Sequence, residues 1–342
     1  MRFLYPMLCR RFTTSGLVCI LSLGLEVHAQ MPGPSAAAMQ LKVQSAQKSA
    51  AAIHASILGA ARAGKRIVAV GDYGTILLSD DDGKTFRQSV SVPVSSTLTA
   101  VSFADDKNGW AVGHWGAILN TVDAGEHWHI QRMDTKEDRP LFSVYFFDGQ
   151  EGIAVGLWSI VLATRDGGKT WDPISLPTPP NGGKADRNLF KIFASDQGSL
   201  FVAAERGTIL SSDDRGRTWH YIQTDYKGSF WSGIGLKEGP LLVAGLRGTI
   251  YRSTDDGRNW QAINSGTKSS ITDIVEMGGK VVAVGLDGVQ VESEDQGASF
   301  TWTQRDDRLS MTAAIGGSGT ALVRFSKKGV VSATLPGAVA NN

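Results

Sequence analysis

Hydrophobic and polar residues alternate with a period of two in short stretches that recur along the chain. Between residues 98 and 132, "LTAVSF" alternates, "GWAVG" is a short apolar run, "AILNT" follows a glycine turn and "HWHIQR" alternates again. A period of two is that of half-buried β-strands, whereas an amphipathic helix repeats every 3.6 residues. The pattern therefore predicts four consecutive short strands.

This four-strand unit repeats about every forty residues. Phrases such as "VAVG" at 68–71 and "WAVG" at 110–113 recur in six copies. The residues in the final slot of this phrase are Gly71, Gly113, Gly156, Ala204, Gly245 and Gly285. A period of about forty residues with four strands per unit is typical of a β-propeller blade. The prediction is an all-β fold, a seven-bladed β-propeller of four-stranded antiparallel blades, over residues 53–336.

The last unit begins near Leu309 and offers three strands instead of four, in "ALVRFSKKGVVSAT". A missing outer strand exposes a sheet edge, and closed rings commonly borrow the strand from the other terminus. We expect residues 40–46, "QLKVQSA", to close the seventh blade. The alternative is that residues 30–52, rich in Ala, Ser and Gln, form a disordered or helical leader. Residues 337–342 form a short C-terminal tail.

A second motif, first seen as "SDDDGKTF" at 79–86, occurs six times between the predicted third and fourth strands. Each copy has an aspartate that can accept turn N–H groups, a glycine suited to positive φ, and an aromatic residue that can pack beneath the turn. We interpret the motif, an Asp-box, as structural. Its aspartates are Asp81, Asp123, Asp166, Asp214, Asp255 and Asp295.

The first 29 residues have the features of a secretory signal. Three arginines precede an apolar run at 16–25, and "VHA" ends at a cleavage site after Ala29. The only two cysteines, Cys9 and Cys19, lie in this segment, so we expect no disulfide in the mature chain. Lipidation at Cys19 remains an alternative. The sequence predicts an exported protein of the periplasm, or of the thylakoid lumen in a photosynthetic organism.

The net charge and the motifs of the chain disfavour several classes of function. The full chain has a formal net charge of +1, and loss of the signal leaves it near neutrality, which disfavours charge-driven binding of nucleic acid. The pair His127 and His129 lacks a third metal ligand, and no phosphate-binding loop is present. We predict no metal and no other cofactor.

An enzyme is the main alternative, because Asp-boxes are named from sialidases and other glycoside hydrolases. Such enzymes need carboxylates at hydrolytic spacing or a tyrosine nucleophile with a base. The predicted inner strands supply Asp273, Glu276 and Tyr145 as candidates. Because no catalytic set is evident, we predict a protein that is not an enzyme. A glycan-binding lectin that uses the central channel, and a purely architectural module, also remain open.

Strand order assigns the two faces of the predicted ring. Turns between the second and third strands share one face with the loops between blades, and the Asp-boxes lie on the other. Aromatic and arginine side chains are enriched at protein-binding surfaces. We expect partner binding by turn residues and by loop residues of the box-free face. The turn residues are Tyr73, Trp115, Trp158, Arg206 and Arg247, and the loop residues are Arg139, Arg187 and Arg308.

Two structural interpretations compete with this expectation. Each loop arginine follows an acid, Asp138, Asp186 or Asp307, with which it can pair. The turn aromatics can also pack on adjacent blades.

The phrase "NGWAVGHWGAILNTVDAGEHW" and its copies resemble the photosystem II assembly and stability factors, a family of seven-bladed Asp-box propellers of the thylakoid lumen with exported bacterial relatives. The resemblance covers roughly residues 53–336. It implies a non-enzymatic factor whose arginine-bearing face binds a membrane-protein subunit during assembly. The implied partner is a photosystem II reaction-centre-like subunit or another envelope complex such as a transporter, without insertion of the mature chain into the membrane.

Overall fold

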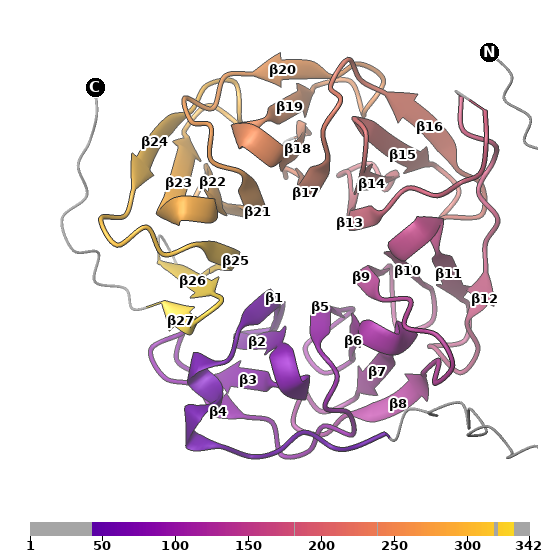
Figure 1. Cartoon of the computed structure of the whole chain (residues 1–342), viewed down its shortest axis with the longest axis vertical. Coiled ribbons are helices and arrows are strands. Elements are labelled where there is room, and N and C mark those ends of the chain that lie inside the picture. Colours follow the sequence, from indigo (N-terminus) through magenta and orange to yellow (C-terminus); the bar gives the residue numbers. More distant parts are fainter. Residues whose placement is uncertain (1–42, 181, 238, 318–320, 332–342) are drawn as a thin grey trace, which may run out of the picture. The chain divides into compact units, whose positions relative to one another are not determined.

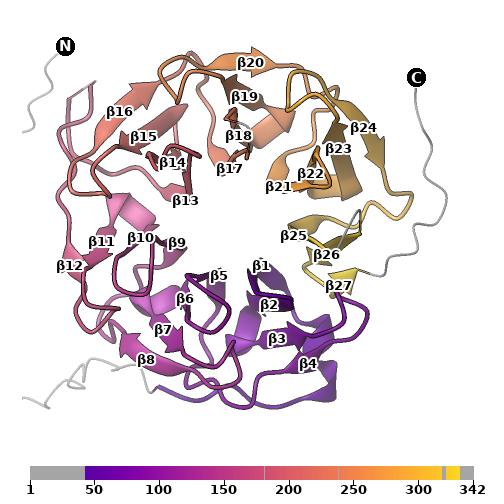
Figure 2. The ribbon, with the colours of Figure 1, turned by 180° about the vertical axis from the view of Figure 1, so that it is seen from behind.

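The computed structural model describes residues 43–180, 182–237, 239–317 and 321–331, so the proposed signal at 1–29 and the tail at 337–342 lie outside the described residues. Within the compact unit that starts at Gln40, the described strands form seven antiparallel sheets arranged as blades around an axis (Figure 1). Figure 2 shows the same ring from behind. The predicted seven-bladed β-propeller is confirmed.

The strands follow each other from the axis outwards in every blade. Blade 1 consists of β1 (Ile57–Ala63), β2 (Arg66–Gly71), β3 (Ile76–Ser79) and β4 (Arg87–Gln88). Blade 2 consists of β5 (Leu98–Phe103), β6 (Gly109–Gly113), β7 (Ile118–Thr121) and β8 (His129–Arg132). Blade 3 consists of β9 (Leu141–Phe146), β10 (Gly152–Gly156), β11 (Val161–Thr164) and β12 (Asp172–Pro173). Blade 4 consists of β13 (Leu189–Ala194), β14 (Leu200–Ala204), β15 (Thr208–Ser212) and β16 (His220–Gln223).

The remaining blades complete the ring. Blade 5 consists of β17 (Phe230–Gly235), β18 (Leu241–Gly245), β19 (Ile250–Ser253) and β20 (Gln261–Ile263). Blade 6 consists of β21 (Ile271–Met277), β22 (Lys280–Gly285), β23 (Val289–Ser293) and β24 (Thr301–Gln304). Blade 7 has three described strands, β25 (Met311–Gly316), β26 (Leu322–Ser326) and β27 (Gly329–Val331).

The core lies between blades and is supplied mainly by the second and third strands. Every residue of β6, β10, β14, β18 and β3 is buried, which explains why these segments read as continuous apolar runs instead of alternating ones. Side chains from neighbouring blades share the same apolar clusters, as Trp110 of β6 does when it stacks on Phe146 of β9. The ring is therefore held by blade-to-blade packing.

Every innermost strand contains a β-bulge directly after its first residue. In β9, for example, Leu141 pairs with Gly156 and Ser143 with Val155, so Phe142 has no partner in the ladder. A bulge bends its strand and redirects the extra side chain. The seven bulge residues are Leu58, Thr99, Phe142, Phe190, Trp231, Thr272 and Thr312.

The first and last blades meet directly. Strand β25 lies against β1, Arg62 Nε donates to Gly316 O at 2.9 Å, and the Thr312 hydroxyl donates to Ile57 O. These contacts join blade 7 to blade 1.

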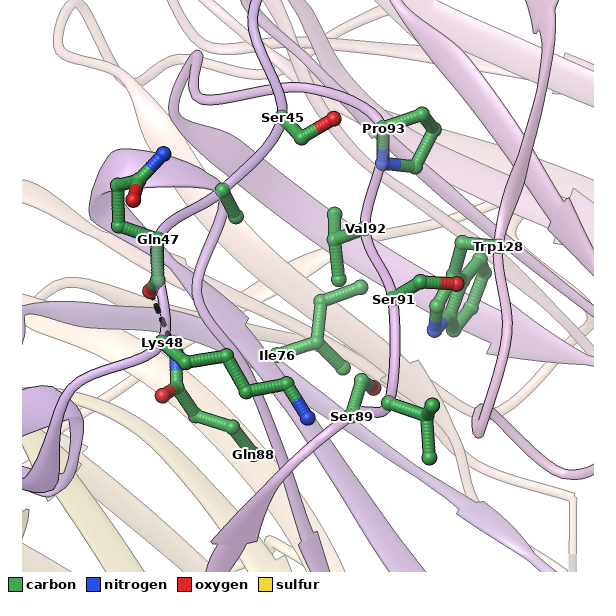
Figure 3. Close-up of a pocket in the computed structure, with 12 residues that line it drawn as sticks. Ser45, Gln47, Lys48, Ile76, Gln88, Ser89, Ser91, Val92, Pro93 and Trp128 are labelled. Atoms are coloured by element: carbon green, nitrogen blue, oxygen red, sulfur yellow. Dashed lines mark hydrogen bonds between the residues drawn. The ribbon is translucent and has the colours of Figure 1, made fainter.

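The N-terminal segment does not pair with β27 in its described part. Residues 43–49 form no strand and run beside blade 1, where Ala46 N donates to Val92 O and Ser49 N to Gln88 Oε1. A crevice of about 230 Å³ lies beside these contacts and is lined by residues 45–48, residues 88–93, Ile76 and Trp128 (Figure 3). The predicted closing strand from residues 40–46 is thus not formed by residues 43–46. Residues 40–42 and 332–342 lie outside the described residues, so for residues 40–42 the closing strand stays a prediction.

The described helices are single turns. They are η1 (Ala50–His54), which packs on β27, and five three-residue 3₁₀ turns after the second strands. No helix in the described part of the chain has the length and apolar character needed to cross a membrane.

Candidate functional site

The two faces of the ring carry different connections. Each first strand starts at one face, so the turn between strands two and three and the link to the next blade return to that face. The Asp-boxes join strands three and four and therefore lie at the opposite face. We call the first the box-free face and the second the box face.

The Asp-boxes are closed by hydrogen bonds within the turn. In the second copy the Thr121 hydroxyl donates to Asp123 Oδ1 at 2.8 Å and accepts from Gly125 N at 3.0 Å, while His127 N donates to Asp123 Oδ1 at 3.0 Å. Trp128 Nε1 then donates to Gly125 O at 3.0 Å. The other five copies repeat the hydroxyl and carboxylate bonds. Each aspartate thus has a local partner that explains its presence without catalysis.

These bonds stabilise the ionised aspartates. The hydroxyl and the backbone N–H of Thr85 lower the pKa of Asp81 to about 2. The backbone N–H and the hydroxyl of Thr170 likewise lower the pKa of Asp166 to about 2. Because hydrogen bonds to a carboxylate favour its charged form, the folded protein holds these protons less tightly than the unfolded chain does.

The boxes should therefore make stability sensitive to acid. An aspartate whose pKa is lower in the folded protein than in the unfolded chain, where it is near 4, stabilises the fold at any pH above 4. This stabilisation is lost as the pH falls towards 2. We expect the thermal midpoint of the Asp81→Asn, Asp166→Asn double variant to lie below that of the wild type at pH 5, and the gap to narrow towards pH 2. Circular dichroism melting across that range measures it. A gap that is constant over the whole range would contradict the expectation.

The three ionisable candidates of the inner strands do not converge. Asp273 accepts hydrogen bonds from Ser232 Oγ at 3.1 Å and Ala314 N at 3.0 Å, which ties blades 5, 6 and 7 together. Glu276 accepts from Lys237 N at 3.0 Å. Tyr145 packs edge-on against Phe147, and its burial raises its pKa. Asp273 and Glu276 are three residues apart on one strand and so point to opposite sides of it.

His127 is also occupied locally. Its Nδ1 lies 2.8 Å from Asp123 Oδ2 of the same box. Among the residues that the structure describes, no group of three or more His, Cys, Asp or Glu side chains is placed to hold a metal ion.

The box-free face carries six turns with an unusual backbone. The residue at each apex has φ between 51° and 61°, in the left-handed region, and the next residue is also left-handed. Two left-handed residues make a type I′ turn, which favours Asn-Gly because other side chains are strained there. The turns are η2 (Asp72–Gly74), η3 (His114–Gly116), η4 (Leu157–Ser159), Glu205–Gly207, η5 (Leu246–Gly248) and η6 (Leu286–Gly288). Their apex residues are Tyr73, Trp115, Trp158, Arg206, Arg247 and Asp287.

Most apex side chains point into solvent despite this strain. Tyr73 is 76% exposed and Trp158 is 53% exposed, while Arg206 and Arg247 are also exposed. Trp115 is half-buried, and its backbone N–H donates to Asp138 Oδ1 at 2.6 Å. The exposed side chains at Tyr73 and Trp158 contribute little burial, so packing on adjacent blades does not explain them.

Replacing Tyr73 with glycine should leave the free energy of unfolding unchanged or raise it by up to about 1 kcal/mol, because glycine adopts the left-handed region without strain. The neighbouring Gly74→Ala change should instead cost about 2 kcal/mol or more, since a Cβ there would lie 2.0 Å from Val94 O. Urea unfolding of both variants measures this. A loss above 1 kcal/mol in Tyr73→Gly would show that the tyrosine supports the fold.

Arg187 and Arg206 lie together in one basic cleft. The cleft, with a volume of about 680 Å³, is lined by Arg187, Arg206, Lys184 and Lys227, together with Asp186 and Gln223. Arg206 has a long ion pair of 3.7 Å with the exposed Asp186. Four cationic side chains and one acidic side chain thus line the cleft. The net positive charge of the cleft favours an anionic ligand.

Arg187 differs from the exposed arginines because it is only 4% exposed. Its guanidinium lies 5.5 Å from the ring centre of Tyr221, and neither its Nε nor the Tyr221 hydroxyl has a hydrogen-bond partner among the described residues. A buried donor without a partner is costly unless a ligand or water satisfies it. Arg187 therefore lines the cleft as a mostly buried side chain that lies against Tyr221.

The other predicted arginines are distributed around the ring. Arg247 and Arg308 are exposed on blade 5 and on the link to blade 7, and Arg308 also has a left-handed φ of 48°. Arg139 is half-buried, with a buried Nε that has no partner among the described residues. Of the eight predicted residues, Arg187 and Arg206 line one cleft. The Trp158 turn contacts the link that carries Arg187, because Trp158 N donates to Asn188 Oδ1 and Ser159 N donates to Arg187 O.

The acids before the loop arginines pair with other residues. Asp138 accepts from Trp115 N and lies 2.8 Å from His114 Nδ1, and Asp307 forms an ion pair with Arg305 at 2.8 Å. The alternative that each loop arginine pairs with the acid before it therefore finds no support at Arg139 and Arg308. Sequence analysis assigned no role to Lys184 or Tyr221, although "GGKADR" places the lysine three residues before Arg187.

Comparisons with known proteins agree with this architecture. Residues 87–241, from the end of blade 1 to the start of β18, match the family model described as photosynthesis system II assembly factor YCF48. No curated protein matches the chain significantly.

Two of the solved structures that resemble this chain are YCF48 proteins. A structure titled "YCF48 bound to D1 peptide" has a TM-score of 0.64 and 18% identity, covering 85% of this chain and 94% of that one. YCF48 from Cyanidioschyzon merolae has a TM-score of 0.62 and 16% identity, covering 85% and 95%. With the family match, these likenesses confirm the resemblance seen in the sequence: the chain is a β-propeller like the photosystem II assembly factors.

Proposed function

We propose that the protein is an exported, non-enzymatic factor that binds a polypeptide segment of a membrane-protein complex on its box-free face and serves the assembly or stability of that complex. The observation that carries the proposal is the basic cleft of Lys184, Arg187, Arg206 and Lys227. Arginine binds a carboxylate through two parallel hydrogen bonds, and the excess of cations in the cleft attracts such a ligand.

The apex side chains extend this surface around the ring. Tyr73 and Trp158 are exposed at turns where glycine or asparagine is conformationally easier. Retaining large aromatic side chains at strained, solvent-exposed positions is consistent with selection for contact with a partner. Tryptophan, tyrosine and arginine side chains are also the residues that most often contribute the largest share of the binding free energy at a protein–protein interface.

The contacts of the inner strands support a role without catalysis. Asp273, Glu276 and each box aspartate already accept backbone or side-chain hydrogen bonds that stabilise blades or turns. A hydrolase would instead need two such groups facing one bond. Export remains part of the proposal because residues 1–29 have the composition of a signal.

The partner is inferred from the relatives. One solved YCF48 is named as bound to a D1 peptide, which supports a photosystem II reaction-centre-like subunit as the partner in a photosynthetic organism. In another organism, an envelope complex such as a transporter would take that place.

Affinity capture from solubilised membranes tests the proposal. The protein should retain one membrane-protein subunit, and the Trp115→Ala, Arg206→Ala double variant should retain much less of it. Mass spectrometry of the retained proteins identifies the partner. Identical partner profiles for both proteins would overturn the assignment to this face, and turnover of a glycoside substrate that Asp273→Asn abolishes would replace it with an enzymatic function.

A further inference from the structure

The axial channel contains a socket near its box-free end. All seven bulge residues line it, and each is the second residue of a strand that starts at the box-free face. The socket has a volume of about 170 Å³. It is separate from the basic cleft, with which it shares no lining residue.

The walls of the socket combine apolar and polar groups. Phe142 and Phe190 stack with ring centres 5.7 Å apart, and Leu58 and Trp231 are the other large apolar side chains of the lining. All four side chains are only half-buried. Partly exposed aromatic rings in a concave site are typical of ligand-binding pockets.

The threonine hydroxyls already donate their protons to backbone carbonyls, so a ligand meets them only as acceptors. Thr99 Oγ1 donates to Leu141 O at 2.6 Å, and Thr272 Oγ1 donates to Met311 O at 2.9 Å. The Thr312 hydroxyl donates in the same way to Ile57 O of the next blade. These bonds hold neighbouring inner strands together at the wall of the socket.

A single charged pair lies one residue further along the inner strands. Lys191 Nζ is 4.0 Å from Asp273 Oδ1, and Lys191 follows the bulge of β13 as Asp273 follows that of β21. Asp273 already accepts from Ser232 Oγ, from Ile274 N and from Ala314 N. Lys191 is 42% exposed and too far from the carboxylate for a short hydrogen bond, so its ammonium retains donors for a ligand.

We propose that this socket binds one tyrosine side chain of the polypeptide that lies on the box-free face. A cavity of about 150 Å³ is large enough for benzene, so about 170 Å³ has room for one six-membered ring. The aromatic walls suit the face of the ring, and the polar part of the lining suits its hydroxyl. The ring would contact Phe142, Phe190 and Trp231, and its hydroxyl oxygen would accept a hydrogen bond from Lys191. A phenylalanine ring fits the same walls and leaves the lysine without that partner.

This inference rests on the proposed function for the source of the tyrosine, but its test needs no partner. N-acetyl-tyrosinamide and N-acetyl-phenylalaninamide are titrated into the purified protein and followed by saturation-transfer NMR. We expect the tyrosine compound to bind about tenfold more tightly or better, the smallest difference that one hydrogen bond to a charged donor supplies.

Three variants locate the binding. Lys191→Met should remove the preference for tyrosine while both compounds still bind, and Lys84→Met on the box face should leave the preference intact. Leu58→Trp, which fills the socket, should abolish binding of both. Circular dichroism checks that the Leu58→Trp variant folds. If it does not fold, the proposal is tested by Lys191→Met alone.

Equal affinity of the two compounds for the wild type, or a preference that survives Lys191→Met, would overturn the proposal. Absence of binding by either compound would overturn it as well. A negative titration would not change the result of the affinity capture that depends on Arg206. A negative capture experiment would likewise not change the titration, so the two proposals can be rejected independently.

Discussion

Replacing Trp128 with alanine is expected to lower the free energy of unfolding by about 3–5 kcal/mol, the usual cost of deleting a fully buried tryptophan side chain. Trp128 is 2% exposed and contacts Phe103 edge-on, with ring centres 6.4 Å apart. Its Nε1 donates to Gly125 O and its backbone N donates to Ser91 O, in the link between blades 1 and 2. The substitution thus removes packing and one box bond together.

Trp158→Ala serves as the matched control for this prediction. The same chemical change at a 53% exposed position should alter the free energy of unfolding by about 0.5 kcal/mol or less. Urea unfolding followed by circular dichroism measures both variants. Equal losses at the two positions would contradict the structural role assigned to the box tryptophan.

Reversing two charges in the basic cleft is expected to weaken partner binding about tenfold or more at low salt. Arg206 and Lys227 are exposed at the cleft, whereas Arg187 is buried, so Arg206→Glu with Lys227→Glu changes the charge with little effect on packing. Charges near an interface mainly change the association rate, and salt screens them. Surface plasmon resonance with the captured partner should therefore show the loss chiefly in the association rate, and less of it at high salt.

The control for charge reversal lies on the box face. Lys84→Glu with Lys169→Glu makes the same change in net charge at two exposed box residues. Association should be nearly unchanged by this pair. Equal effects of both pairs would mean that net charge, and not the cleft, governs binding.

The sequence predicts the blades and the boxes because both depend on local patterns. Alternation with a period of two indicates strands directly, and a glycine at the end of most second strands indicates turns. The box needs only a hydroxyl, a carboxylate and a glycine within four residues, as Thr121, Asp123 and Gly125 illustrate. No distant contact is required to recognise either.

The candidate site was less predictable because it depends on packing between blades. Arg187 was expected to be a loop residue available to a partner or to Asp186, yet it is buried beneath the surface and lies against Tyr221. The left-handed apex turns are also invisible in a sequence that places Tyr, Trp and Arg where Asn is usual. A glycine directly after the apex residue, where one is present, is the one sequence signal for these turns.

The axial socket illustrates the same limit. Phe142, Phe190 and Trp231 look like ordinary strand residues, and only the bulge in the ladder turns them towards the axis. Lys191 in "FKIFAS" was overlooked among the ionisable groups of the inner strands. Its relation to Asp273, two blades away, is set by the closure of the ring.

The central claim is that the box-free face, opposite the Asp-boxes, binds the partner. Site-specific photocrosslinking tests it most directly, with the photoreactive residue p-benzoylphenylalanine placed at position 158 on the box-free face or at position 169 in a box. Both positions are exposed. The account predicts a crosslink to the partner from position 158 and none from position 169. A crosslink from position 169 alone would contradict it.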